Sequence, residues 1–343
     1  MSDILVIGGG VIGLLTAREL AASGADVTLV EMGETGRESS WAGGGIISPL
    51  YPWRYDESVT ALARWSQAVY PELCATLRDE SGIDPEYIAT GMLILDEHEQ
   101  EDALSWAATH GAVVEIIDAD AAHTHEPGLG LRPKSAMWLP EIAQVRNPRL
   151  TKALRRSIER EVRVREHEEV VELLVDQGRA AGARTRKETI HADKVVVCTG
   201  AWTAKLLEQL GTKPEIEPVR GQIMLFFANP GQVNHIGSTL EHTGFLKTTT
   251  AEAKEELYRI AVEMFPLLRR TPIENHWAGL RPGSPSGIPY IGSYPGIRGL
   301  YFNAGHFRNG LVTGPASARL VADLVLTREP VVDPAPYALE ALR

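Results

Sequence analysis

Residues 4–31 read ILVIGGGVIGLLTARELAASGADVTLVE, and this stretch decides the fold class. It begins with four apolar residues, as does a strand that is buried on both faces of a parallel sheet. Gly8, Gly10 and Gly13 follow directly in G-x-G-x-x-G spacing, and apolar residues then recur at helical spacing. A second apolar run ends in Glu31. Strand, glycines, helix, strand and terminal acid arrive in the order of one dinucleotide-binding βαβ unit.

The glycines and the acid have defined physical roles in such a unit. Glycine lets the chain turn tightly, lets the backbone approach a pyrophosphate and lets the helix pack closely on the strand. The helix then directs the positive end of its dipole at the phosphates. Glu31 stands where a carboxylate accepts hydrogen bonds from ribose hydroxyls, which favours an unphosphorylated adenosine ribose. The motif predicts a dinucleotide cofactor but does not choose between FAD and NAD.

Length and composition restrict the class of protein. The chain has 343 residues, of which 44% are hydrophobic, enough for two domains or one large one. Its formal net charge of -11 argues against a general nucleic-acid binder, because lysine and arginine hold phosphate backbones. No apolar stretch reaches the roughly 18 residues of a membrane span, and the N-terminus lacks a signal-peptide pattern. We therefore expect a cytoplasmic protein with no transmembrane segment.

The cysteines and histidines predict no metal site. Cys74 and Cys198 are the only cysteines and form no C-x-x-C pair, so neither a disulfide framework nor a zinc site is expected. Cys198 ends an apolar run and is interpreted as a small buried residue rather than a reactive thiol. His123, His125 and Glu126 could be drawn as a metal cluster, but we expect them to lie in a solvated loop.

Two further segments favour a ligand beside the first βαβ unit. Residues 33–49 are small and glycine-dense, so backbone amides and hydroxyls could surround a flat or anionic ligand; a flexible surface loop is the alternative. Residues 191–202 predict a buried strand that ends in Thr199 and Gly200 just before a helix. The loop at Gly200 is therefore predicted to press on a dinucleotide that lies over the first unit.

Several separate motifs along the chain occur in one order. They are residues 8–13 with Glu31, residues 39–45 (SSWAGGG), residues 195–202 (VVVCTGAW), residues 277–282 (WAGLRP) and residues 305–310 (GHFRNG). By these motifs the chain resembles the FAD-dependent amino-acid oxidase family, which contains glycine, sarcosine and D-amino-acid oxidases. Within the family it is most similar to the bacterial glycine oxidases of thiamine biosynthesis. The resemblance covers nearly the whole chain.

The resemblance implies an α/β fold in which a Rossmann-type FAD-binding domain is interleaved with an α+β substrate domain on a mostly antiparallel sheet. Residues 1–85, 141–217 and 278–343 would form the FAD-binding domain, and residues 86–140 and 218–277 the substrate domain. FAD would be non-covalent, because no cysteine stands in the late position where sarcosine oxidases attach flavin.

Motif and resemblance together implicate one set of residues in FAD binding. Val170 would lie near the adenine, and residues 306–312 would run beside the isoalloxazine ring. The set comprises Gly8, Gly10, Val11, Ile12, Gly13, Glu31, Met32, Ser39, Ser40, Gly44, Gly45, Ile46, Val170, Gly200, His306, Phe307, Arg308, Asn309, Gly310, Leu311 and Val312.

The resemblance also implies a substrate site built on two arginines. In the family an arginine at the position of Arg281 binds the substrate carboxylate, and Arg308 lies in the same pocket. The chemistry agrees, because a planar guanidinium can bind a carboxylate through two parallel hydrogen bonds and keeps its charge at every working pH. A surface ion pair is the alternative for each arginine.

The implied activity is oxidative deamination of glycine or another small amine or D-amino acid. Hydride would pass from the α-carbon to the flavin, water would hydrolyse the imine to an oxo acid and ammonia, and oxygen would be reduced to hydrogen peroxide. No side-chain base is needed once the substrate is held and oriented. The expected partners are a small amino acid and molecular oxygen; homo-oligomer formation stays open. So do three alternatives: a D-amino-acid dehydrogenase with another acceptor, an inactive flavin-binding protein and an NAD-dependent dehydrogenase.

One passage departs from the family pattern. After Phe227 the family has a longer stretch, in which a strand supplies a substrate-facing tyrosine. Here residues 228–236 (ANPGQVNHI) stand in its place, with no tyrosine and no alternating strand pattern. We expect a segment to be missing between Ile236 and Gly237, in preference to a true deletion of the pocket wall.

Overall fold

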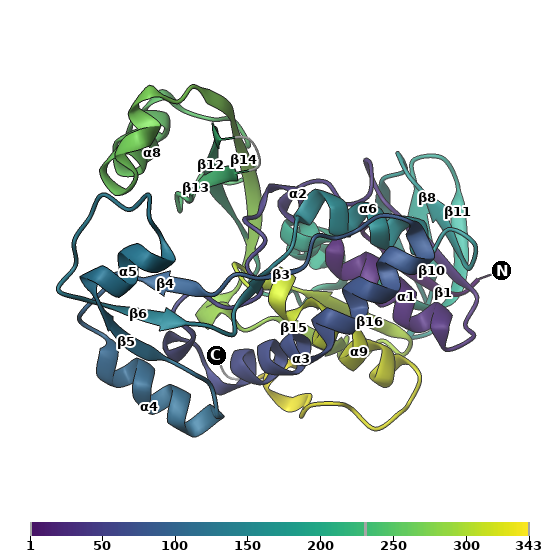
Figure 1. Ribbon diagram of the computed structural model, residues 1–343. Coiled ribbons are helices and arrows are strands. Elements are labelled where there is room, and N and C mark those ends of the chain that lie inside the picture. Colours follow the sequence, from purple (N-terminus) through teal and green to yellow (C-terminus); the bar gives the residue numbers. More distant parts are fainter. Residues whose placement is uncertain (1, 230–231, 342–343) are drawn as a thin grey trace.

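Eight strands form a central sheet in the computed structural model, which describes residues 2–229 and 232–341. The strands are β1 (Ser2–Ile7), β2 (Val27–Val30), β8 (Val162–Arg165), β9 (Val170–Asp176), β10 (Arg179–Thr185), β11 (Thr189–Val197), β15 (Tyr290–Ser293) and β16 (Leu300–Ala304). Neighbours in the series β16-β11-β1-β2-β8 pair in parallel, whereas β15, β10 and β9 add antiparallel pairs (Figure 1). The predicted α/β class is confirmed.

Successive residues of β1 face opposite sides of the central sheet. Ile4 and Val6 pack into one apolar cluster, and Leu5 and Ile7 pack into another. All four are buried, because both sides of the sheet are covered. This double burial explains why the strand is apolar at every position rather than at alternate positions.

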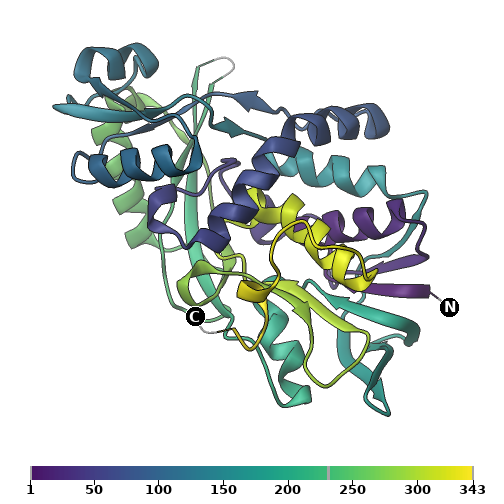
Figure 2. The same ribbon diagram turned by 90° about the horizontal axis from the view of Figure 1, so that it is seen from below.

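Helices cover one side of the central sheet, and a hairpin with a short helix covers the other. The first side carries α1 (Val11–Ala22), α3 (Glu57–Ser81), α6 (Asn147–Ser157) and α9 (Gly310–Val325). Both α1 and α3 contact α9, and α3 and α9 lie side by side in Figure 2. On the second side, Leu173 of the β9–β10 hairpin and Leu207 of α7 (Thr203–Leu207) join the cluster of Leu5 and Ile7.

Two three-stranded antiparallel sheets lie apart from the central sheet (Figure 1). The first has the order β13-β12-β14 and the second β4-β6-β5. Their strands are β12 (Glu217–Asn229), β13 (Gln232–Gly237), β14 (Ile273–Gly283), β4 (Met92–Ile94), β5 (Glu115–Asp118) and β6 (Ser135–Leu139). The predicted antiparallel strands are thus present, in two sheets. The exact division of the chain into two domains stays a prediction.

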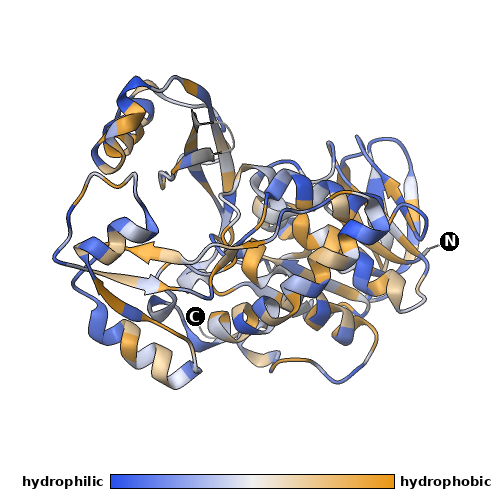
Figure 3. Ribbon diagram, in the orientation of Figure 1, coloured by the Kyte–Doolittle hydropathy of each residue, from blue (hydrophilic) through white to orange (hydrophobic). Residues whose placement is uncertain are grey.

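Short elements complete these outer parts of the fold. Helix α8 (Ala251–Met264) packs Leu257 and Ala261 on Met224 and Phe226 of β12, and its ribbon carries both hydrophobic and hydrophilic stretches in Figure 3. The remaining elements are α2 (Ser39–Ala42), α4 (Gln100–His110), α5 (Ala119–His125), β3 (Ile88–Ala89) and β7 (Ala143–Gln144).

The loop predicted around His123 and His125 is wrong. Both residues lie in α5, where a ring nitrogen of His123 contacts the Ala119 carbonyl at 2.7 Å and His125 stacks on Trp138 with 3.9 Å between ring centroids. No group of three potential metal ligands occurs within residues 2–229 and 232–341. The two histidines thus belong to a helix rather than to a loop, and His125 remains exposed to solvent.

A strand follows Phe227 although residues 228–236 lack an alternating pattern. Residues 232–237 form β13, which pairs with β12 through main-chain hydrogen bonds. Such bonds do not require an alternating side-chain pattern. Pro230 and Gly231 lie outside the described residues.

Candidate active site

A cavity of about 1080 Å³ runs from the end of β1 to the β12–β14 sheet. Drug-sized ligands occupy pockets of roughly 300–1,000 Å³, so this cavity has room for a dinucleotide and a small second molecule. Its walls include the first turn of α1, residues 43–46, the loop after β11 and the start of α9. The cavity therefore lies where parallel strands end, the usual ligand position in an open α/β sheet.

Most residues predicted to bind the cofactor line this cavity, as do Arg281 and Arg308. Gly13 and Val312 do not. A Cβ on Gly13 would lie 1.8 Å from the carbonyl oxygen of Gly8, so this glycine exists to pack α1 against the preceding turn. Val312 is buried in the core beneath α9. These two residues support the cavity wall from behind, and their part in cofactor binding stays a prediction.

The first glycine turn is shaped by close approach of backbone to backbone. Gly8 has φ +106°, and a Cβ there would lie 2.4 Å from the Cys198 carbonyl oxygen at the end of β11. At the start of α1, the Val11 N–H donates to Ser40 Oγ at 2.9 Å. The turn, α1 and the segment containing Ser40 therefore meet at one end of the cavity.

Glu31 lies beside this turn at the end of β2. Its carboxylate accepts hydrogen bonds from the Gly9 N–H at 2.7 Å and the Gly33 N–H at 2.8 Å. Burial raises the pKa of Glu31, and the two N–H groups oppose that rise. Two backbone donors thus orient the carboxylate on the cavity wall, as the ribose-binding role requires.

Two of the sequence motifs pack directly on each other. Trp277 of β14 donates its indole N–H to the Ala42 carbonyl at 3.2 Å, and its ring meets that of Trp41 edge-on with 5.4 Å between centroids. Gly279 allows this approach, because a Cβ there would lie 2.7 Å from the Ala42 Cβ. Residues 39–45 and 277–282 therefore join the central sheet's end of the cavity to the outer sheet.

Arg281 projects from β14 into the outer end of the cavity. Its guanidinium lies over Gly221 of β12, where a Cβ would be 2.1 Å from Nη1. It donates to the Thr239 carbonyl at 3.1 Å and also to Ser238 Oγ. Burial, and then the nearby Arg308, lower the pKa of Arg281 to about 10, so the group keeps its charge at neutral pH. Among the described residues, no carboxylate pairs with Arg281 or Arg308.

The strand β13 adds cavity-lining residues that the sequence did not predict. His235, Ile236 and Ser238 all line the outer end of the cavity. The His235 ring meets Trp277 edge-on, with 5.7 Å between centroids. Burial, and then Arg146, lower the pKa of His235, which favours the neutral imidazole. One sequence signal could have located these residues. The apolar run ending at Phe227 predicts a strand, and an antiparallel partner commonly follows such a strand after a short turn.

Comparison with known proteins decides the family. A family model described as FAD dependent oxidoreductase matches residues 3–324. The chain belongs to this family. Glycine oxidases of Pseudomonas aeruginosa and Pseudomonas putida are 50% and 48% identical to it, and each alignment covers 98% of both chains. The crystal structure of glycine oxidase from Geobacillus kaustophilus has a TM-score of 0.91 at 29% identity, covering 100% of this chain and 99% of that one. The prediction of FAD is confirmed.

The cavity of this FAD-dependent oxidoreductase fits a flavin dinucleotide. Asn309, at the start of α9, has a buried side-chain N–H group with no hydrogen-bond partner, and an unpaired buried donor costs about 1–3 kcal/mol. A bound ring with carbonyl or nitrogen acceptors would satisfy it. Gly44 and Gly200 have no described atom within 4 Å of a Cβ position, so bare backbone faces the space that such a ligand needs.

His306 is a structural rather than an acid–base residue. It is 2% exposed, and its ring nitrogens lie 2.9 Å from Asn303 Oδ1 and 3.0 Å from Thr313 Oγ1. With Asn303 Oδ1 as the acceptor, Nε2 carries the proton, and Nδ1 lies beside the Thr313 hydroxyl, which donates to the Asn309 carbonyl at 2.9 Å. Burial lowers the pKa of His306 to about 3, so the ring is neutral at working pH.

The chain is shorter than its alignment with the P. aeruginosa enzyme. The P. aeruginosa alignment spans 355 positions against the 343 residues of the whole chain, so that enzyme has residues without a counterpart here. In the structure β13 continues through Ile236 and Gly237, which pair with Met224 and Ile223. The expectation of a missing segment at this point stays a prediction.

Among the described helices, none is both long and apolar enough to cross a membrane.

Substitution of Gly13 tests the contact that brings α1 to the cavity. In Gly13→Val the side chain would collide with the Gly8 carbonyl and move the first-turn amides, so we expect loss of most bound FAD. The flavin-to-protein absorbance ratio after dialysis against FAD measures this. Ala22→Val places the same side chain at an exposed position of α1 and should keep FAD. A fully yellow Gly13→Val protein would contradict the assignment.

The state of the two cysteines predicts how FAD is held. Burial raises the pKa of both Cys74 and Cys198 to about 12, so each remains a thiol, and the Cys198 thiol donates weakly to Thr16 Oγ1. A protonated thiol is a poor nucleophile toward flavin. Acid precipitation of the holoenzyme should therefore release all of the flavin into the supernatant. Colour that stays in the washed pellet would show a covalent link.

Proposed function

We propose that this enzyme oxidatively deaminates glycine and other small amines or D-amino acids. The observation that carries the proposal is the half-buried Arg281 guanidinium, which faces the FAD cavity without a carboxylate partner among the described residues. A partly desolvated positive charge without a partner favours binding of an anion. The relatives with about half of their residues identical to this chain are glycine oxidases, so an amino-acid carboxylate is the anion we propose.

Arg281 would hold the substrate by its carboxylate. Two of its N–H groups are used on Thr239 and Ser238, which prevents the guanidinium from rotating, while the remaining donors can bind both oxygens of a carboxylate. Fixing one end of a molecule as small as glycine also fixes its α-carbon, and orientation of this kind lowers the barrier of the chemical step. The small cavity end bounded by His235 and Ile236 favours small substrates.

The residues around the substrate favour its neutral amine. Arg308 lines the cavity and makes no ion pair with a described residue, so its charge disfavours a second positive charge on the substrate nitrogen. His306 is neutral and has both ring nitrogens engaged, and we assign it no role as a base. When bound, FAD supplies the hydride acceptor and is reoxidised by molecular oxygen with formation of hydrogen peroxide.

Different cavity residues would bind different parts of FAD. The turn of Gly8 and Gly10 with the start of α1 would bind the pyrophosphate, Glu31 the ribose and Val170 the adenine end, and residues 306–311 would lie beside the ring system. The link would be non-covalent. Anaerobic addition of glycine, sarcosine or D-alanine should bleach the flavin, and readmitted oxygen should restore it with release of peroxide. Bleaching without reoxidation by oxygen would identify a dehydrogenase, and no bleaching an inactive flavoprotein.

Replacement of Arg281 by lysine tests the carboxylate site. Arg281→Lys keeps the charge but loses the two-pronged geometry, and a lost charge-assisted hydrogen bond of about 1.5–3 kcal/mol corresponds to a ten- to hundredfold higher KM for glycine. Steady-state peroxide formation measures KM, and flavin absorbance checks that FAD is retained. Arg259→Lys, on the exposed side of α8, is the matched control. An unchanged KM in Arg281→Lys would overturn the assignment.

A further inference from the structure

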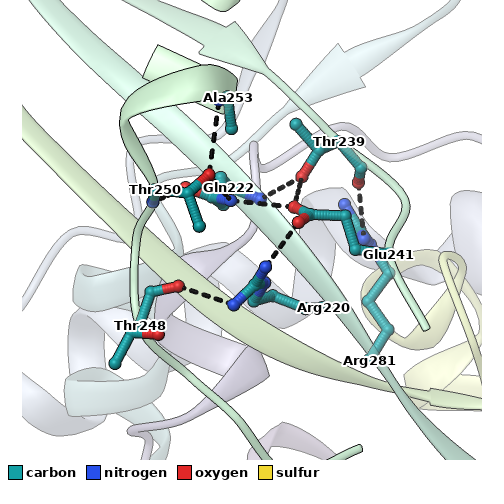
Figure 4. Close-up of polar contacts among 8 residues, drawn as sticks. All are labelled: Arg220, Gln222, Thr239, Glu241, Thr248, Thr250, Ala253 and Arg281. Carbon is teal, nitrogen blue, oxygen red and sulfur yellow. Dashed lines mark hydrogen bonds and ion pairs between the residues drawn. The ribbon is translucent and has the colours of Figure 1, made fainter. Parts of the chain in front are cut away.

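A buried polar network lies behind β12, on the side away from Arg281 (Figure 4). We call it the Glu241 network; its side chains are Arg220, Gln222, Thr239, Glu241 and Thr250. Glu241 receives hydrogen bonds from Arg220 at 2.5 Å, from Gln222 Nε2 at 2.9 Å and from the Thr239 hydroxyl at 2.5 Å. Arg220 is 5% exposed and Gln222 is fully buried. The network therefore contains an ion pair between a buried arginine and a half-buried glutamate.

The charge of Glu241 is the centre of this network. Burial alone would raise its pKa, but hydrogen bonds from Arg220, Thr239 and Gln222 outweigh burial and lower the pKa to about 2. Glu241 is thus ionised throughout the working range of an enzyme. The Glu241 side chain is 24% exposed, so water screens part of its attraction to Arg220. The three hydrogen bonds matter chiefly because they fix the position of the carboxylate.

The Glu241 network makes hydrogen bonds to a segment that belongs to no regular sheet. Residues 238–250 contain neither a helix nor a regular strand. The Glu241 N–H and C=O exchange hydrogen bonds with Arg220 at 3.0 and 2.9 Å. At the far end, Arg220 Nη1 donates to the Thr248 carbonyl at 2.9 Å, and the Thr250 N–H donates to Gln222 Oε1 at 2.9 Å. Two side chains of one strand therefore hold this segment at both ends.

Thr239 connects the network to Arg281. Successive side chains of β12 alternate between faces, so Arg220 and Gln222 lie on one face and Arg281 lies over Gly221 on the other. The Thr239 hydroxyl donates to Glu241 and accepts from the Gln222 N–H at 2.9 Å. Its carbonyl accepts from Arg281 Nη1 on the opposite side (Figure 4). The side chain of Thr239 thus belongs to the Glu241 network, while its main-chain carbonyl binds Arg281.

We propose that Glu241 is a positioning residue that, through Thr239, orients the Arg281 guanidinium for the substrate carboxylate. This inference rests on the proposed role of Arg281. The Arg281 guanidinium has no carboxylate among described residues to orient it, so its direction depends on the Thr239 carbonyl and the adjacent Ser238 hydroxyl. Both acceptors belong to the segment that Glu241 holds. Movement of this segment would turn the free N–H groups away from the substrate without removing any residue that touches it.

The test measures binding of acetate, a carboxylate without an amine to oxidise. Acetate is titrated into the holoenzyme while flavin absorbance is followed, and its inhibition constant against glycine is measured in parallel. Thr239→Val removes the hydroxyl but leaves the carbonyl, and should weaken acetate binding about five- to tenfold, the size of one or two net hydrogen bonds. Glu241→Gln should weaken it about tenfold or more. Thr239→Ser restores the hydroxyl and should bind acetate within about twofold of the native enzyme.

The controls separate positioning from stability and from failure of the proposed function. Glu217→Gln removes an exposed acid of the same strand, paired only with His242, and should leave acetate binding unchanged. FAD content and melting temperature are recorded for each variant. Native acetate affinity in folded, flavin-loaded Thr239→Val and Glu241→Gln, with only the melting temperature lowered, would overturn the positioning role. No acetate binding by the native holoenzyme, or native affinity in Arg281→Lys, would contradict the proposed function instead.

Discussion

The close contact between helix α1 and the turn after β1 is the constraint on which the whole site depends. A Cβ on Gly13 would lie 1.8 Å from the Gly8 carbonyl oxygen, and a Cβ on Gly8 would lie 2.4 Å from the Cys198 carbonyl oxygen after β11, so no side chain fits between these three segments. Their backbones therefore converge on one point. That convergence directs the first turn of α1 at the cavity and places Glu31 beside it, as a pyrophosphate and its ribose require.

The outer end of the cavity is determined by a charged side chain rather than by close backbone packing. There the essential group is charged, and removal from water lowers the pKa of Arg281 without discharging it. A carbonyl and a hydroxyl satisfy part of the guanidinium and leave the rest for an anion. Because neutral acceptors orient Arg281, a substrate carboxylate does not have to displace a competing acid. The acid of this region, Glu241, is kept on the other face of β12 with Arg220.

Two glycines near the junction of the central and outer sheets permit close contacts between segments rather than backbone flexibility. Gly221 leaves space for the Arg281 guanidinium, and Gly279 lets Trp277 reach the Ala42 carbonyl. Each lies in a regular strand, where a glycine otherwise weakens the sheet. The outer sheet can therefore touch the FAD-binding segment closely enough to close one cavity around cofactor and substrate.

The sequence by itself determined the α/β class and the βαβ unit with its glycine turn and Glu31. These features depend on local patterns: apolar runs, glycine spacing and strand ends that meet at one edge of a sheet. Resemblance added most of the other predicted cofactor residues, together with Arg281 and Arg308. Packing places Gly13 and Val312 behind the cavity wall, which a pattern does not record.

The tertiary structure alone decided the outer end of the site. The hairpin strand β13, with His235, is held by main-chain pairing, which requires no alternating side-chain pattern, and Ser238 follows it directly. The Glu241 network joins residues on β12 to an irregular segment about 20 positions away, and opposite faces of one strand connect it to Arg281. Such contacts arise when distant segments meet in the fold, and neither periodicity nor motif spacing records them.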